Sequence, residues 1–406
     1  MPATNEKATP RGAALIETIR LEGREALAHV PLPDRAQHLW RYTDPTEVVP
    51  PEIVSASDGG PPRLDLETVV EADEAARAVG VLVLPLWQAA EALPEQVASI
   101  FGRLVPAAFG RPESLNASLW SAGHFVKIPR GAQVEVPIRI LTTLAGAKGF
   151  RAVRNLIVVE EDASVTIVEE SRGPDGSGAG AIVNEVTELF VAPGGQVRYA
   201  PIQHVGKKVV SHRTVRARLD REARLQMAIA SFGAGLYKAD LRVDLAGEGA
   251  ESRMTGVVYG DGRQRADHHT VHDHVAPRTF SDIDFRVALA DRARSAYTGL
   301  IRIAKNAPHC EAYQENKNLL LSEESRAESI PELEILTDEV RCKHGAAVGP
   351  VDPDQLFYLN SRGLAHADAM RIVVGGFLEQ TLSQIPGTVA DSLREETSRR
   401  LGGLSR

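Results

Sequence analysis

The sequence predicts a mainly β protein whose centre is a solenoid of stacked coils, with helical regions before and after it. Between residues 125 and 350, short apolar runs alternate with turns, and signals for helices are few. Within this stretch a turn, a small residue and an alternating apolar segment recur six times, at intervals of about 30 residues. Such a unit is typical of β-helices, in which each coil buries a strand face against its neighbours.

The recurring small residues mark where strands of the solenoid are expected to begin. They are Ala132, Ala163, Gly195, Ala223, Ala250 and Ala293, each preceded by turn residues. An antiparallel β-sandwich would also place turns between short strands. We favour the solenoid because a sandwich has no reason to repeat one strand-start pattern. The longer last interval leaves room for a coil that the pattern misses.

Residues 1–124 are expected to form a mainly helical region. Apolar positions recur with helical spacing over residues 11–28, and two further helical patterns follow near 67–77 and 90–108. The change to alternating patterns then marks the predicted start of the β-helix core, which extends over residues 125–350.

Residues 351–406 are expected to be helical again. A stripe with helical spacing comprises Met370, Val373, Val374, Phe377 and Leu378, and Pro386-Gly387 separates it from a last helix. This helix pair is expected either to cover the terminal coil of the solenoid or to bind a partner. From these residues alone we favour the cover, because the terminal coils of a solenoid must be shielded.

Composition excludes several classes of protein. The chain has 406 residues, a formal net charge of -8 and two cysteines, Cys310 and Cys342. Two thiols cannot build a disulfide scaffold or a four-thiolate iron–sulfur or zinc site. The acidic balance argues against sequence-independent nucleic-acid binding. The N-terminus lacks the apolar core of a secretory signal and no apolar run approaches about 20 residues, so we expect a cytoplasmic protein.

Residues 267–274, Asp-His-His-Thr-Val-His-Asp-His, are the densest candidate for metal chemistry. On a strand, His268, His272 and His274 share one face while His269 points the other way. Three imidazoles spread over about 7 to 13 Å cannot all reach one ion, although His272 and His274 could share one with ligands from another coil. The favoured alternative is a ladder of polar side chains along a solvated face of the coil.

Cys342 and His344 form a second candidate, within Arg341-Cys342-Lys343-His344-Gly345. Their two-residue spacing on an extended chain places both on one face, where they could contact one soft metal ion. Arg341 and Lys343 would favour a thiolate, which is the form that binds metals. The alternative is a buried cysteine and a hydrogen-bonded histidine at the end of a strand.

Signatures of several enzyme classes are absent from the sequence. It contains no GxxxxGK[ST] phosphate loop and no GxGxxG, HExxH or GxSxG motif. A cytosolic β-helix hydrolase or lyase that uses the histidine-rich strand remains the alternative to a non-enzymatic role.

Four segments together resemble one known family. They are Trp40-Arg41-Tyr42-Thr43 and residues 316–322, 342–346 and 355–363. In this order they are similar to segments of the SufB/SufD family of iron–sulfur cluster assembly scaffolds. Residues 267–281 also resemble the histidine-rich strand of that family.

Within this family the chain is more similar to SufD than to SufB. SufB-type chains carry a cysteine-containing segment where this chain has residues 316–321, and a His-Glu pair where it has His344-Gly345. The Cys-x-His-Gly-Ala arrangement that begins at Cys342 resembles SufD. Lys343 and Asn360 replace the serine and arginine that are common there.

The resemblance implies a right-handed parallel β-helix with helical flanks and a non-catalytic role. It implies pairing with SufB through the β-helix and docking of the ATPase SufC, which would bind the ATP, on the C-terminal helices. It leaves a homodimer open when the chain is alone. By this resemblance His344 would face SufB and help to hold a nascent iron–sulfur cluster or iron. Cys342 and His344 offer only part of a coordination sphere, so the cluster would be shared with SufB. The implied docking also favours partner binding by the C-terminal helices over the cover.

Overall fold

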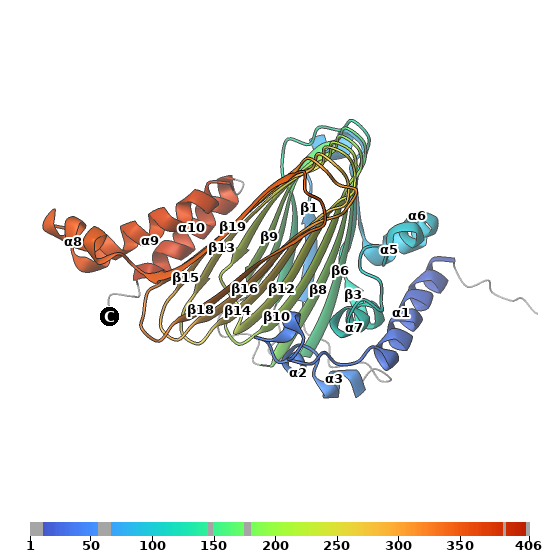
Figure 1. Cartoon of the computed structure of the whole chain (residues 1–406). Coiled ribbons are helices and arrows are strands. Elements are labelled where there is room, and N and C mark those ends of the chain that lie inside the picture. The colour runs from blue at the N-terminus through green and yellow to red at the C-terminus, as the bar shows by residue number, and fades with distance from the viewer. Residues whose placement is uncertain (1–10, 56–65, 145–148, 174–179, 385–386, 403–406) are drawn as a thin grey trace, which may run out of the picture.

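The computed structural model describes residues 11–55, 66–144, 149–173, 180–384 and 387–402, and its centre is a parallel β-helix with helices on either side (Figure 1). One sheet has the strand order β1-β5-β7-β9-β11-β13-β15-β17-β19, and the other has the order β18-β16-β14-β12-β10-β8-β6-β4-β2. From β4 onward, consecutive strands therefore alternate between the sheets, and the chain winds into coils. The predicted β-helix is confirmed.

Most strands have nine to eleven residues and pair in parallel with the coil before and after. The odd-strand sheet contains β1 (Leu66–Glu71), β5 (Ile138–Leu144), β7 (Ser164–Arg172), β9 (Gln196–His204), β11 (Arg224–Ser231), β13 (Glu251–Gly260), β15 (Phe280–Leu289), β17 (Cys310–Leu320) and β19 (Val340–Pro350). The even-strand sheet contains β2 (Leu82–Pro85), β4 (His124–Ile128), β6 (Gly149–Val159), β8 (Ala181–Val191), β10 (Val210–Leu219), β12 (Leu236–Leu245), β14 (Arg265–His274), β16 (Arg294–Ile303) and β18 (Arg326–Ile335), while β3 (Trp120–Ala122) pairs with β6. Only β1 and β2 pair antiparallel, with β5 and β4, among the described strands.

A left-handed backbone conformation precedes the strand starts of β7, β9, β11, β13, β15 and β17 in the odd-strand sheet, and it also precedes Ala132. The residues with positive φ at this position are Gly131, Asp162, Gly194, Glu222, Gly249, Arg278 and His309. Five of the recurring small residues follow this turn directly, but Ala293 does not, because it precedes β16 of the other sheet. Ladder register shows that Thr279 and Cys310 take the equivalent positions after Ala250. The pattern missed these two coils because neither residue is a small apolar one.

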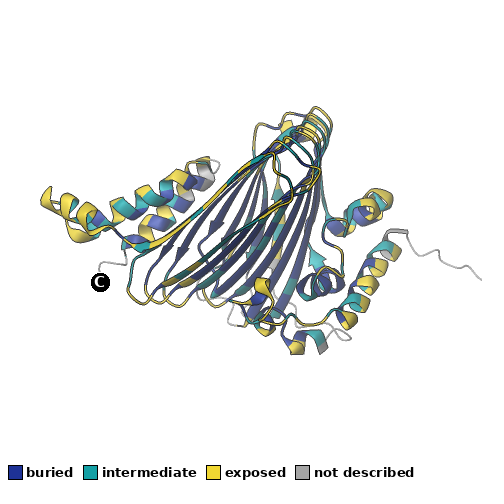
Figure 2. Ribbon diagram, viewed as in Figure 1, coloured by how far each residue is buried: buried dark blue, intermediate teal, exposed yellow. Residues whose placement is uncertain are grey.

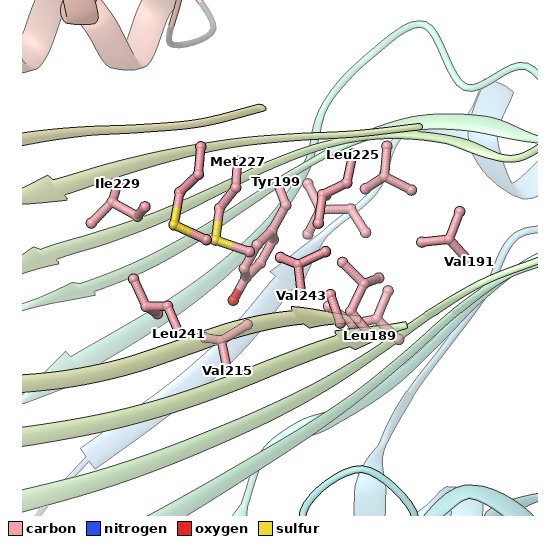
Figure 3. Packing of buried hydrophobic residues seen from close by; sticks show 14 of the residues in the cluster. Leu189, Val191, Tyr199, Val215, Leu225, Met227, Ile229, Leu241 and Val243 are labelled. Carbon is pink, nitrogen blue, oxygen red and sulfur yellow. The ribbon is translucent and has the colours of Figure 1, made fainter. Parts of the chain in front are cut away.

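The space between the two sheets is filled by apolar side chains (Figure 3). Leu189, Val215, Leu241 and Val243 of the even-strand sheet lie across from Tyr199, Leu225, Met227 and Ile229 of the odd-strand sheet. All of these side chains are at most 2% exposed. Burial of each large apolar side chain stabilises the fold by about 1.5–3 kcal/mol, so the stack of coils supplies its own core.

The N-terminal helices lie along the even-strand sheet. They are α1 (Arg11–His29), η1 (His38–Trp40), α2 (Pro45–Val48), α3 (Pro51–Ser55), α4 (Glu74–Ala78), α5 (Leu86–Ala92), α6 (Pro94–Ile100) and α7 (Arg111–Leu119). The helix expected over 11–28 is confirmed. The helix expected over 67–77 is wrong: β1 pairs with β5 instead, and only a short helix follows. The helix expected over 90–108 is broken at Pro94, which cannot continue a helix, and ends at Ile100.

The C-terminal helices are α8 (Pro353–Ser361), α9 (His366–Leu382) and α10 (Gly387–Gly402), and they lie on the opposite side of the solenoid from the N-terminal helices (Figure 1). Val374 and Leu378 of the predicted stripe are fully buried in one cluster with residues of the odd-strand sheet. The Arg286 guanidinium lies 5.4 Å from the ring centroid of Phe377. The stripe therefore fastens α9 to the outer face of β13 and β15, so the expectation that it covers the terminal coil is wrong.

None of the helices in the described part of the chain combines the length and apolar character needed to span a bilayer.

Candidate functional site

The solenoid ends in two strands, β18 and β19, whose outer edges are paired with no other strand in the described part of the chain. The side chains of both strands are half-buried or exposed, unlike the buried strands of the earlier coils (Figure 2). Ile335, Leu336 and Val348 are 38%, 50% and 47% exposed there. An open edge presents free N–H and C=O groups and is a ready template for pairing with another chain.

Ladder register places both candidate residues at this open end. Cys342 lies beside Ala312 of β17, and His344 lies beside Gln314. Gln314 is 3% exposed and its Nε2 donates to the carbonyl of Gly299 in the opposite sheet, at 3.2 Å. Side chains on this face therefore point into the space between the sheets, which at β19 opens to solvent. Cys342 and His344 share this face, as their spacing predicted.

The thiol of Cys342 is half-buried, and burial, followed by the nearby Cys310, raises its pKa above the usual value of 9.0. Arg341 lies on the other face of the strand, where its guanidinium is 3.4 Å from Glu311. The expectation that Arg341 and Lys343 favour a thiolate is therefore wrong for the chain alone. Alternation along the strand directs both cationic side chains away from the thiol.

The other thiol, Cys310, is fully buried and serves the core. Its Sγ lies 3.1 Å from the Thr279 hydroxyl and donates to the carbonyl of Ala307 at 3.2 Å. Across the described ranges, no group of three or more His, Cys, Asp or Glu side chains is arranged to hold a metal ion. Cys342 and His344 supply two donors of a kind that suits iron, and a four-coordinate site needs more.

The histidine-rich strand is β14, which lies between β12 and β16. His268, His272 and His274 are at most 1% exposed and share hydrogen bonds of 2.7–2.9 Å with the hydroxyls of Ser231, Ser252, Thr279 and Ser281. Burial lowers the pKa of His268 and His274 to about 4 and that of His272 to about 3. The predicted common face is confirmed, but the expected solvated setting is wrong, because these neutral rings face the interior.

The other side of β14 binds the N-terminal segment. His269 Nε2 lies 2.9 Å from Asp267, whose second oxygen accepts hydrogen bonds from Thr43 at 2.5 Å and from Lys238 at 3.2 Å. Burial alone would raise the pKa of Asp267, but Lys238 and His269 hold it well below its usual range. The Lys238 ammonium also lies 4.8 Å from the ring centroid of Trp40. This cluster fixes the Trp-Arg-Tyr-Thr segment onto the β-helix.

The buried histidines bear on the alternative of a β-helix hydrolase or lyase. A polysaccharide or phosphate ester must touch the groups that act on it. His268, His269, His272 and His274 are at most 1% exposed, and each has a hydrogen-bond partner within the chain. His268, His272 and His274 therefore serve as structural packing, which their dense spacing in the sequence did not reveal.

A second exposed feature lies on the C-terminal helices and was not predicted. Phe357 and Tyr358 on α8 are 72% and 57% exposed, and Ile372 on α9 is 53% exposed. These apolar side chains are separate from the buried stripe of α9. Phe357 and Tyr358 lie in the segment 355–363, which was noted above only for its resemblance. The helical spacing of apolar residues outside the stripe was the signal that could have identified them. We call Phe357, Tyr358 and Ile372 the α8–α9 apolar surface.

Comparison with known proteins gives a consistent result. Residues 142–377 match the model of the family described as SUF system FeS cluster assembly, SufBD core domain. The chain is 28% identical over 286 residues to the iron–sulfur cluster assembly protein SufB of Bacillus subtilis, and equally to SufBD family proteins of Staphylococcus saprophyticus and Staphylococcus epidermidis. The matched region covers 70% of this chain and 61% of each relative's length.

Proposed function

Because the chain belongs to the SufBD family of the SUF iron–sulfur cluster assembly system, we propose that it is a SufD-like, non-catalytic subunit of a cytoplasmic SufB–SufC–SufD scaffold. In this role it contributes Cys342 and His344 to a site for a nascent iron–sulfur cluster or iron, and SufB supplies the remaining ligands. The observation that carries the proposal is the open end of the solenoid, where both side chains lie on one face of β19, a strand whose outer edge pairs with no other described strand.

Pairing with SufB through this end is supported by the state of β18 and β19. Unpaired strand edges bind a partner by adding its strands to the sheet, which satisfies main-chain groups on both sides. Exposed Leu336 and Val348 offer apolar surface for the same contact. A partner seated here would also bring its own side chains within reach of Cys342 and His344.

The SufD-like assignment is supported by residues near the proposed site. Asn316, in the segment where SufB-type chains carry a cysteine, is fully buried, and its Nδ2 donates to the carbonyl of Phe285 at 3.3 Å. Gly345 follows His344 and has no side chain, so the carboxylate of the SufB-type His-Glu pair is missing here. The chain therefore brings fewer ligands than SufB-type chains, as a supporting subunit requires.

Docking of SufC is assigned to the α8–α9 apolar surface. Phe357 is 72% exposed, and aromatic side chains are enriched at the centres of protein interfaces. Binding of ATP by SufC would account for the lack of a phosphate loop in this chain.

The cluster role is tested by co-expressing His344→Ala and Cys342→Ser chains with SufB and SufC and measuring the iron and sulfide bound per complex. We expect each variant to lower cluster content at least about tenfold if it removes a direct ligand. The matched control is His29→Ala, since His29 is also exposed but lies on α1. Cluster content equal to the unmutated complex in both site variants would refute their role.

The docking surface is tested by a pull-down of SufC with Phe357→Asp. A charge placed at the centre of an apolar interface is expected to abolish capture, while Leu21→Asp on α1, at a site 49% exposed, leaves it intact. Circular dichroism reports whether both variants fold. Full retention of SufC by the folded Phe357→Asp chain would exclude this surface.

A further inference from the structure

Three arginines lie side by side at the first positions of consecutive even-numbered strands. Arg265 of β14 is in register with Arg294 of β16, and Arg294 is in register with Arg326 of β18. Neighbouring strands are about 4.8 Å apart, so the row presents three guanidinium-bearing positions within about 10 Å. We call these three residues the arginine row. Like charges directly opposite each other on a sheet destabilise it, so the row has an electrostatic cost.

Another charged row on the same sheet is arranged differently. At the far end of β16, Arg302 is flanked by Asp273 and Glu334, at distances of 3.7 and 3.5 Å. Carboxylates thus alternate with the arginine there and cancel its charge across the strands. The arginine row has no carboxylate within it, which sets it apart.

A pocket of about 470 Å³ lies against the arginine row. Its other wall comes from the N-terminal segment, through Arg35, Tyr42 and Thr43. Its volume falls within the range of about 300–1,000 Å³ that is usual for small-molecule sites. The row therefore borders a hollow between two parts of the chain, with an aromatic ring on the opposite wall.

The charges around the pocket leave cationic groups available. Arg265 is neutralised by a two-pronged ion pair with Glu47. Arg326 donates to the carbonyls of Glu323 and Ser325, which carry no net charge, at 2.6 and 2.7 Å. The guanidinium of Arg294 forms no hydrogen bond or ion pair with any residue that the structure describes, and Arg294 is exposed. The guanidinium groups of Arg294 and Arg326 thus form no ion pair with a described carboxylate, although Arg326 acts on the nearby Glu324 through space.

Two carboxylates line the same pocket. Asp267 is engaged by Lys238, His269 and Thr43 and is almost fully buried. Glu328 is exposed on the edge strand β18, two positions after Arg326. It disfavours an anion at its own position and thereby restricts anionic groups to the arginine row.

We propose that this pocket binds a small molecule that carries a diphosphate or longer oligophosphate group. Guanidinium groups bind phosphate oxygens through paired, charge-assisted hydrogen bonds. An anion extended along the row contacts Arg294 and Arg326 together, and it relieves the repulsion between neighbouring arginines. Tyr42 lines the pocket and offers a contact for the rest of the molecule. Arg326 and Glu328 lie on β18, which also belongs to the surface proposed to pair with SufB, so the proposal is tested on the chain alone.

The test is a titration of the full chain with sodium pyrophosphate at low ionic strength, in which isothermal titration calorimetry measures the heat of binding. We expect saturable binding that weakens about tenfold in Arg294→Gln and strengthens in Glu328→Gln. Arg302→Gln is the matched control, because it removes an exposed arginine from the other end of the same strand. It is expected to leave the affinity unchanged, and orthophosphate is expected to bind more weakly.

Four results would overturn the proposal. They are no saturable heat with pyrophosphate, equal losses in Arg294→Gln and Arg302→Gln, equal affinity for orthophosphate, or tighter Arg294-dependent binding of a glutamate-rich peptide. Equal losses would mean diffuse attraction to surface charge, and peptide binding would mean that the occupant is an acidic protein segment. Arg294, Arg302 and Glu328 are exposed, so we expect each variant to fold. A thermal melt of each variant checks this.

Discussion

Thr43 donates its hydroxyl hydrogen to Oδ2 of Asp267 over 2.5 Å, and the two residues are 224 positions apart in the chain. The contact joins the Trp-Arg-Tyr-Thr segment to the histidine-rich strand, two features that are far apart in the sequence. Both residues are at most 3% exposed. The N-terminal region is thus held onto the β-helix by a buried polar contact as well as by apolar packing.

The first prediction concerns this contact. Thr43→Val removes a hydroxyl and leaves one oxygen of a buried carboxylate with fewer donors, which is expected to cost about 1–3 kcal/mol of unfolding free energy. Unfolding in urea measures this loss of unfolding free energy. Thr18→Val on the exposed side of α1 is the control and should change stability by less than about 0.5 kcal/mol. If the Thr43→Val chain were as stable as the control, the contact would contribute nothing to the free energy of unfolding.

The second prediction concerns pH. The pKa of His268 and His274 is lowered to about 4 and that of His272 to about 3, against 6.5 in the unfolded chain. Below pH 6.5 the unfolded chain binds protons that the folded chain refuses, so stability falls as the pH falls from 6.5 towards 4. Each such histidine adds a slope of about 1.4 kcal/mol per pH unit.

Urea midpoints measured between pH 7.5 and 4.5 test this slope. His272→Asn should make the dependence on pH shallower by about one histidine's share, whatever it does to stability at neutral pH. His29→Asn, at an exposed position, should leave the slope unchanged. Stability that does not vary between pH 6.5 and 4.5 would contradict the prediction.

The third prediction concerns a buried ion pair under the N-terminal helices. Arg154 and Glu188 are fully buried and 2.6 Å apart, and Glu188 also accepts backbone N–H groups of Gly102, Leu104 and Val105. Glu188→Gln leaves Arg154 without its carboxylate and is expected to cost about 3–5 kcal/mol.

Denaturant unfolding of single and double variants checks this. Arg154→Met with Glu188→Leu should recover part of the loss, since no charge is then left unpaired. Arg302→Gln, which disrupts a pair that is about half exposed, should cost under about 1 kcal/mol. If Glu188→Gln lost no more stability than Arg302→Gln, the buried pair would contribute nothing.

The fourth prediction concerns thiol reactivity. Burial raises the pKa of Cys342, so less of it is thiolate at pH 7.5 than in the unfolded chain. We expect iodoacetamide to modify Cys342 of the native isolated chain more slowly than after unfolding in urea, and Cys310 only after unfolding. Mass spectrometry of peptides over time measures both. Faster native labelling at Cys342 would mean that a cation activates it after all.

The periodic pattern of apolar residues and turns predicted much of the fold. The strand-start pattern identified five of the coil positions correctly, because at these positions a small residue follows a left-handed residue where the coil bends into the odd-strand sheet. It failed at Thr279 and Cys310, where hydrogen bonding within the core replaces the small apolar side chain. The helix expected over 67–77 failed for another reason, since pairing with β5 outweighed a short helical pattern.

Local spacing also placed Cys342 and His344 on one face, because alternation along a strand needs no tertiary information. Whether that face was buried or open depended on β19 being the last strand of its sheet, and only the fold decides this. The same holds for Arg341 and Lys343. Their nearness in sequence suggested a thiolate, whereas the pleat of the strand turns both away from the thiol.

The sequence alone therefore determined the β-helix, the helix at residues 11–28 and the shared face of Cys342 and His344, because all of these follow from short-range periodicity. Tertiary structure decided what each face meets. It placed the histidines inside the solenoid, fastened the stripe of α9 to the odd-strand sheet and left β18 and β19 open. The physical reason is that burial depends on neighbours one or more coils away, and no local pattern specifies which coil is the last.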